Sequence, residues 1–265
     1  MNSRPEKFQL SVLATSLPLR FEGAIEQIRR LGFTHVDVVG QVERPPSHLD
    51  ALADSGLLVS CVAIGRDLLE GDILDAPSVA TRRRAVDQIQ RQIADAARLG
   101  ATHCYVVPGT DAGVDGLTRF SETCCLLADF AQSRMVRLCV EHVPGRRLAS
   151  AAATLEWLEE VAHPNLGLLV DVGHCLISAE KPAQIIEKAG GHLAYVHLDD
   201  NDGENDLHWP LLSGRMTEQM LADALGALRR AGYRGALAFE YRADNAHPIE
   251  ALRRGKELVE RLLRT

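Results

Sequence analysis

The chain has 265 residues, of which 46% are hydrophobic and 25% are charged, a composition that is typical of globular proteins and excludes long disordered stretches. Its 36 acidic and 29 basic side chains give a net charge of −7, which argues against a sequence-independent DNA or RNA binder, because such a protein needs a basic surface to neutralise phosphates. No apolar run approaches the roughly 20 residues of a membrane-spanning helix, so we expect neither a nucleic acid nor a membrane as a partner.

Short apolar runs alternate with longer amphipathic segments along the chain. Runs of this kind, almost continuously apolar, are typical of strands buried on both faces of a parallel sheet. The predicted strands are residues 8–13, 35–39, 59–64, 104–107, 137–142, 167–171, 194–198 and 236–241. Amphipathic helices are predicted over residues 21–31, 78–99, 220–231 and 249–263.

Eight strand-then-helix units predict a parallel sheet closed into one (β/α)8 TIM barrel, an α/β fold, with residues 1–265 as a single domain. The alternative is an open doubly wound sheet. Such a sheet more often carries a glycine-rich turn after its first strand, whereas residues 14–18 here contain no glycine. The pattern therefore favours the barrel.

The start of the chain and the cysteines bear on its location. Residues 1–7 are polar and do not have the pattern of a signal peptide. No two cysteines form a CxxC pair, so a thiolate zinc site is not expected. We expect a cytoplasmic protein whose cysteines are all reduced. They are Cys61, Cys104, Cys124, Cys125, Cys139 and Cys175.

The last four predicted strands carry acidic or imidazole side chains near their carboxyl ends: Glu141, Asp171, His197 and Glu240. Because side chains alternate along a strand, these four point into the barrel if the residues two positions earlier do. Three converging carboxylates repel one another, and a divalent cation removes that repulsion. This donor set suits Mn²⁺, Mg²⁺ or Co²⁺, with Zn²⁺ as an alternative. The other interpretation is four ordinary polar groups bonded to loops.

At these positions the chain resembles the xylose-isomerase-like barrels, a family that includes sugar isomerases, ketose 3-epimerases, hydroxypyruvate isomerase, dehydratases and endonuclease IV. The resemblance covers nearly the whole chain. It implies that Glu141, Asp171, His197 and Glu240 bind one divalent metal ion and that His174 touches substrate. It is most specific in the segments Val140-Glu141-His142, His163-Pro164-Asn165-Leu166-Gly167, Asp171-Val172-Gly173-His174, Val196-His197-Leu198-Asp199-Asp200-Asn201 and Phe239-Glu240.

The resemblance implies a metal-dependent sugar or sugar-phosphate isomerase or epimerase of carbohydrate metabolism. The metal would stabilise an enediolate formed from a polyol or keto-sugar substrate. By the same analogy Glu141 and Glu240 are the acid and base candidates, and His174 orients or polarises a substrate oxygen. Family members are often dimers or tetramers, so a homo-oligomer is an open expectation.

Further substrate contacts are predicted after the seventh strand. His208 lies in an Asp206-Leu207-His208 segment expected to face the site, and Arg215 follows that segment. An arginine there would bind a substrate carboxylate or phosphate. Trp209 either stacks over substrate or caps the barrel mouth. The other arginines in loops after strands are interpreted as solvated charges: Arg66, Arg146, Arg147 and Arg242.

Three alternatives stay open. A dehydratase of a cyclic keto-polyol, such as 3-dehydroshikimate or inosose, would use the same ligands, and Arg147 and Gly203 stand where ketose 3-epimerases carry a glutamate and an arginine. An endonuclease IV-like hydrolase needs three zinc ions, but the third and fourth strands do not end in histidine. A barrel that binds metal without turnover is the third alternative. His142 is either a hydrogen-bonding group outside the barrel axis or a substrate contact.

Overall fold

The computed structural model describes residues 8–68, 73–109, 113 and 115–264. Its strands form one eight-stranded parallel sheet in the order β1-β8-β7-β6-β5-β4-β3-β2. A parallel bridge between Leu13 and Asp37 joins the two ends of that order, so the sheet closes on itself. The strands are β1 (Gln9–Val12), β2 (His35–Val39), β3 (Leu58–Ala63), β4 (His103–Val106), β5 (Arg137–Glu141), β6 (Leu166–Asp171), β7 (Leu193–Leu198) and β8 (Ala236–Phe239).

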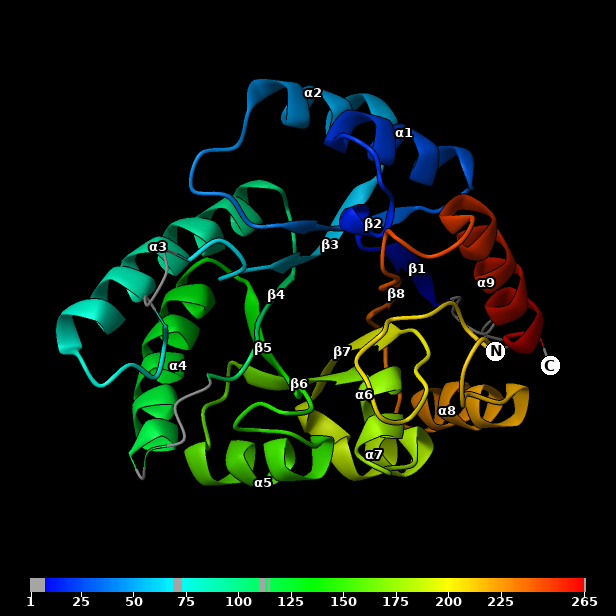
Figure 1. Ribbon diagram of the computed structural model, residues 1–265. Helices are drawn as coiled ribbons and strands as arrows, with labels where there is room; N and C mark the ends of the chain where they lie inside the picture. The colour runs from blue at the N-terminus through cyan, green and yellow to red at the C-terminus, as the bar shows by residue number, and fades with distance from the viewer. Residues whose placement is uncertain (1–7, 69–72, 110–112, 114, 265) are drawn as a thin grey trace, which may run out of the picture.

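Helices surround the strands (Figure 1), and the predicted (β/α)8 TIM barrel is confirmed. The prediction about residues 1–7 lies outside the described residues. In the described chain the α-helices are α1 (Phe21–Arg30), α2 (Pro46–Ser55), α3 (Val79–Arg98), α4 (Gly116–Ser133), α5 (Ala151–Val161), α6 (Val172–Ile177), α7 (Pro182–Ala189), α8 (Glu218–Arg230) and α9 (Pro248–Leu262), with 3-10 turns η1 (Ala14–Ser16) and η2 (Gly190–His192).

The helices form where apolar residues recur on one face and a suitable cap begins the segment. In α3, Ile89 and Ile93 are fully buried, and the hydroxyl of Ser78 accepts a hydrogen bond from the Thr81 N–H. The helix ends before Gly100, whose φ of +74° suits a left-handed turn. No helix in the described part of the chain is long and apolar enough to cross a membrane.

The strands bury side chains on both faces, which gives the molecule two apolar layers. One layer lies between the sheet and the helices. The smaller one fills the barrel interior and contains Cys139, Leu169, Tyr195 and Ala238. These are the residues two positions before Glu141, Asp171, His197 and Glu240. The assumption that these residues point into the barrel is therefore correct.

Five strands end earlier than predicted: β8 by two residues, and β1, β3, β4 and β5 by one residue each. β8 ends at Phe239 rather than residue 241, because the Tyr241 N–H donates to the hydroxyl of Ser16 instead of to a neighbouring strand. β5 ends at Glu141 rather than residue 142, because the Val143 N–H turns back to the Leu148 carbonyl.

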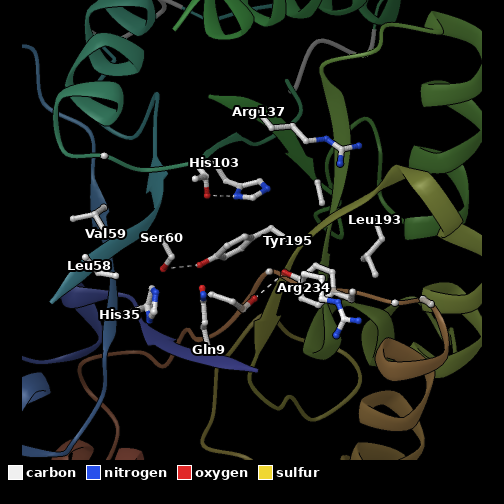
Figure 2. A pocket seen from close by; sticks show the side chains of 18 of the residues that line it. Gln9, His35, Leu58, Val59, Ser60, His103, Arg137, Leu193, Tyr195 and Arg234 are labelled. Carbon is white, nitrogen blue, oxygen red and sulfur yellow. Dashed lines mark hydrogen bonds between the residues drawn. The ribbon is translucent and has the colours of Figure 1, made fainter. Parts of the chain in front are cut away.

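A cavity of about 720 Å³ lies where the strands begin, at the end of the barrel opposite Glu141 and Glu240. Figure 2 shows it from close by, with His35, His103 and Arg137 around it. These three residues are the first of β2, β4 and β5. Since the chemistry of TIM barrels sits at the other end of the strands, this cavity is not where we expect turnover.

Candidate metal centre

Glu141, Asp171, His197 and Glu240 converge at the carboxyl ends of β5 to β8. All four are buried, and each offers one ligand atom within 4.8 Å of the others. The Nδ1 atom of His197 lies 3.0 Å from Glu141 Oε1, 2.5 Å from Glu240 Oε2 and 4.0 Å from Asp171 Oδ2. The structure thus brings together the four predicted ligands, and their binding of a metal remains a prediction.

Unpaired oxygens in this group test whether a cation fits. Asp171 Oδ2 is buried and makes no hydrogen bond in the described structure. The single His197 Nδ1 atom lies close to both Glu240 Oε2, at 2.5 Å, and Glu141 Oε1, at 3.0 Å, but of these two described oxygens it forms a hydrogen bond only with Glu141. Buried carboxylate oxygens without partners are costly. Burial opposes ionisation of Glu240, but the nearby His197 imidazole holds the pKa of that carboxyl well below its usual range. A buried group of anionic oxygens with one imidazole fits a divalent cation.

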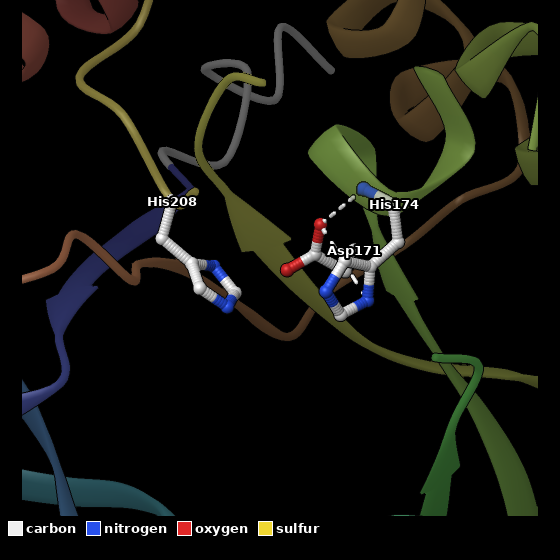
Figure 3. Close-up of side chains that lie close together, drawn as sticks. All are labelled: Asp171, His174 and His208. Atoms are coloured by element: carbon white, nitrogen blue, oxygen red, sulfur yellow. Dashed lines mark hydrogen bonds and ion pairs between the residues drawn. The ribbon is translucent and has the colours of Figure 1, made fainter. Parts of the chain in front are cut away.

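A second cluster lies beside the first and shares Asp171 with it. Figure 3 shows Asp171, His174 and His208, whose ligand atoms also lie within 4.8 Å of one another. Oδ1 of Asp206 is 3.1 Å from the Nε2 atoms of both histidines. Asp171 therefore stands between the four-residue group and a pair of imidazoles.

Hydrogen bonds on the Nδ1 side fix both histidines. The His174 Nδ1–H donates to the His142 carbonyl at 2.8 Å, and the His208 Nδ1–H donates to Asp199 Oδ2 at 2.6 Å. Burial disfavours the charged form of His208, but Asp199 raises its pKa to about 10. For His174, Asp171 and Asp206 outweigh burial and raise the pKa well above its ordinary value. With Nδ1 fixed in this way, the Nε2 atom of each ring points toward Asp206.

The local backbone explains these positions. Asp171 ends β6 and caps α6, since its Oδ1 accepts from the His174 N–H at 2.8 Å. After β7 the Asn201 side chain accepts from the backbone N–H groups of Leu207 and His208. These bonds hold His208 at a φ of +43°, a conformation that non-glycine residues rarely adopt.

A cavity of about 450 Å³ opens over both clusters. Arg66, at its wall, donates through Nη2 to the Tyr105 hydroxyl at 2.7 Å and to Glu240 Oε1 at 3.1 Å. The side chain of Arg66 is 43% exposed, so its guanidinium group contacts both the buried Glu240 and solvent. Among the residues that the structure describes, the polar ones that line the cavity are Arg66, Glu141, Arg146, His174, Asp206, His208 and Glu240.

Other predicted residues lie away from this cavity. Arg215 packs against Gly203 and is not among the described residues of the cavity wall, so its substrate contact stays a prediction. Trp209 pairs with Asp200 through two backbone hydrogen bonds. Arg242 forms an exposed ion pair with Asp244. His142 is buried behind the wall, where its Nε2 accepts from the Asp171 N–H at 3.3 Å.

Sequence reasoning did not find every residue of the site. Asp199 follows His197 by two positions, so the alternation along β7 could have placed it with the others. Tyr105, which lies edge-on to the His197 ring at 5.1 Å, gave no polar signal in its apolar strand. Arg66 has the sequence context of an ordinary loop charge, since its partner Glu240 is 174 positions away.

Comparisons with known proteins agree with the barrel. Solved structures with this fold include an L-ribulose 3-epimerase, with 20% identity, a TM-score of 0.81, and 97% of this chain and 96% of that chain covered. A D-tagatose 3-epimerase-like protein has 20% identity, a TM-score of 0.80 and 97% coverage of both chains. The apo form of 3-keto-D-glucoside 4-epimerase from E. coli has 19% identity and a TM-score of 0.81, with 96% of this chain and 100% of that chain covered.

The sequence comparisons are more decisive for the family. No curated protein matches the chain in sequence. The family model described as "Xylose isomerase-like TIM barrel" matches residues 25–262. With the closed sheet and the converging strand ends, this match places the protein: the chain belongs to the xylose isomerase-like TIM barrel family.

Proposed function

We propose that the protein is a divalent-metal-dependent sugar isomerase or epimerase that acts on a keto-sugar or polyol. The observation that carries the proposal is the convergence of Glu141, Asp171, His197 and Glu240 under a cavity that two further histidines line. Similar folds named as sugar epimerases support the same class of reaction. No part of the proposal requires a nucleic acid or a membrane.

In this proposal Glu141, Asp171, His197 and Glu240 hold one ion of Mn²⁺, Mg²⁺ or Co²⁺, with Zn²⁺ as the alternative. When bound, the cation would supply Lewis-acid stabilisation of negative charge on the substrate oxygens. The binding site needs no large rearrangement, because the four ligand atoms already lie within 4.8 Å of one another.

In this proposal, different side chains at the cavity wall carry out the two proton transfers. Glu141 and Glu240 both line the cavity, so one accepts the proton from the carbon beside the substrate carbonyl and the other returns it. His174 and His208 line the same cavity, with their Nε2 atoms 3.1 Å from Asp206 Oδ1, and we expect both rings to contact substrate oxygens. Where the proton returns decides the product. Return to the opposite face gives an epimer, and return to the neighbouring carbon gives an isomer.

Solvent deuterium exchange tests the proposal directly. The Mn²⁺- or Mg²⁺-treated protein is incubated in D₂O with ketoses such as D-tagatose, D-fructose and D-allulose, and with 3-dehydroshikimate and inosose. After the metal is removed by chelation, we expect proton NMR to show that the proton signal at a carbon next to the carbonyl is lost, because deuterium has replaced that proton. The structure of the product then separates an isomerase or epimerase from a dehydratase.

Two variants control this experiment. Glu240→Gln removes a carboxylate of the site and should abolish the exchange while circular dichroism stays native. Glu218→Gln changes an exposed glutamate on α8 that pairs with Arg261, and exchange should persist. Absence of exchange with every compound, in protein shown to bind the metal, would contradict the proposal and favour a barrel without turnover.

A further inference from the structure

We propose that Asp37, on β2, is a positioning residue that sets the orientation and tautomer of His197 for metal binding. The inference rests on the metal centre of the proposed function. The sequence pattern did not single out Asp37, and it lies outside the four-residue group. Its carboxylate is completely buried in the barrel interior, beneath the His197 ring.

One oxygen of Asp37 is fixed by three hydroxyl groups. Oδ1 accepts from Ser11 Oγ at 2.7 Å, from Ser60 Oγ at 2.6 Å and from the Tyr195 hydroxyl at 2.8 Å. Figure 2 shows Ser60 and Tyr195 from the side of the cavity where the strands begin, with the hydrogen bond between them. Donors from β1, β3 and β7 therefore hold the carboxylate in one orientation.

The other oxygen faces His197. Asp37 Oδ2 and His197 Nε2 are both buried, neither makes a hydrogen bond in the described structure, and they lie 4.0 Å apart. Two buried polar atoms of opposite character that face each other at this distance are each other's available partner, since leaving either one unpaired is costly. A shift of about 1 Å closes a normal hydrogen bond.

The two nitrogens of His197 then have separate tasks. Nδ1 faces Glu141 and Glu240, so it is the nitrogen on the side of the cation. An imidazole that gives its Nδ1 lone pair to a metal must carry its proton on Nε2, and that proton needs an acceptor. Asp37 Oδ2 supplies it. The Tyr105 and Tyr195 rings, nearly perpendicular to the imidazole at 83° and 89°, restrict its rotation.

Metal affinity of Asp37→Asn tests the inference. The amide keeps the size of the side chain and can still bond the three hydroxyl groups, which accept as well as donate. It removes the anionic acceptor for Nε2–H. Loss of such an outer partner costs roughly 10- to 100-fold in metal affinity. We expect a Kd for Mn²⁺ raised by that factor in titrations followed by the EPR signal of free Mn²⁺, with native circular dichroism.

Tyr195→Phe is the matched control. It removes one hydrogen bond from Asp37 Oδ1 and leaves Oδ2 opposite His197. It should lower thermal stability while the Kd for Mn²⁺ stays near that of the wild type. Equal metal affinity in wild type and Asp37→Asn would overturn the inference. Failure of the wild type to bind any divalent cation would instead overturn the proposed function, so the two failures are distinguishable.

A measurement on the wild type covers the case in which Asp37→Asn does not fold. Long-range ¹H–¹⁵N NMR of Zn²⁺-loaded protein, with the His197 signals assigned by their loss in His197→Gln, reports the tautomer. We expect a proton on Nε2, shifted downfield by a hydrogen bond, and none on Nδ1. A proton on Nδ1 with a bare Nε2 would contradict the role of Asp37.

Discussion

His174 is the residue whose surroundings best separate catalysis from metal binding. Its ring hydrogen-bonds the His142 carbonyl through Nδ1 and lines the cavity, but it is outside the four-residue group. We expect His174→Ala to lower kcat by about 100-fold or more, the size typical of a lost acid–base group, with little change in the Kd for Mn²⁺. Steady-state kinetics and metal titration check this.

His163→Gln is the control for that variant, because His163 lies at the α5–β6 turn, where it pairs with Asp129. It should retain wild-type kinetics. A His174→Ala protein that lost metal but kept the kinetic constants of its loaded fraction would reassign His174 to support of the metal ligands.

His103 should make the protein sensitive to acid. Burial, together with Arg137, lowers the pKa of His103 to about 4 from its ordinary 6.5. The unfolded chain therefore takes up this proton below about pH 6.5, whereas the folded protein does so only near pH 4, and stability falls as the pH drops through that window. The loss amounts to about 1.4 kcal/mol for each pH unit within it.

Urea unfolding at pH 7.5 and pH 4.5 measures the effect. The difference in unfolding free energy between the two pH values should be smaller in His103→Gln than in the wild type. His192→Gln, on the η2 turn, is the control and should keep the wild-type difference. An unchanged difference in His103→Gln would contradict the assignment.

At the scale of residues, the sequence predicted the side chains whose positions follow from alternation along a strand. It did not predict side-chain contacts between residues that are far apart in the chain. Glu141, Asp171, His197 and Glu240 follow from a two-residue period and four aligned strands. The acceptor beneath His197 comes from Asp37, 160 positions earlier, and no local pattern links the two. Such a pairing is set by barrel closure, which a reading along the chain does not reveal.

The junction of β6 and α6 is the element on which the site depends most. A Cβ on Gly173 would lie 2.2 Å from Asp199 Oδ1 and 2.5 Å from Asn201 Nδ2, far inside contact distance. We expect Gly173→Ala to destabilise the protein by about 1–3 kcal/mol, as overpacking of a buried site does. Because Asp199 also holds His208, activity should fall more than stability alone explains.

Gly191→Ala is the matched control for Gly173→Ala, since nothing lies within 4 Å of a Cβ built there. Chemical denaturation and kinetics of the two variants check the prediction. Wild-type stability of Gly173→Ala would show that Asp199 can move without cost and would remove the argument for a rigid junction.

Element boundaries were predicted less well than the elements themselves. The long helix α3 was expected over residues 78–99 and spans Val79–Arg98, because its apolar period and its glycine stop are both local signals. β8 ends two residues earlier than expected. The partner of the Tyr241 N–H is a side chain on η1, and apolar character alone cannot distinguish such a contact from a strand.

At the scale of the whole molecule, the barrel was predictable because eight repeats of one pattern have few ways to bury their strands. The expectation of one domain over residues 1–265 stays a prediction. The closed sheet also explains why the four predicted ligands converge: β5 to β8 are neighbours in the sheet, so their carboxyl ends share one edge.

The metal content of the whole molecule gives the last prediction. We expect one tightly bound divalent cation per chain by elemental analysis, because β3 and β4 are followed by Ile64 and Val107 and bring no histidine to the site. A cation at 100 times its Kd stabilises the fold by about 2.7 kcal/mol, which corresponds to roughly 5–10 °C in Tm for a chain of this size. Thermal unfolding with Mn²⁺ and with EDTA measures this shift, and Glu240→Gln should reduce it. Three tightly held zinc ions per chain would contradict both the stoichiometry and the isomerase proposal, and would favour endonuclease IV-like hydrolysis.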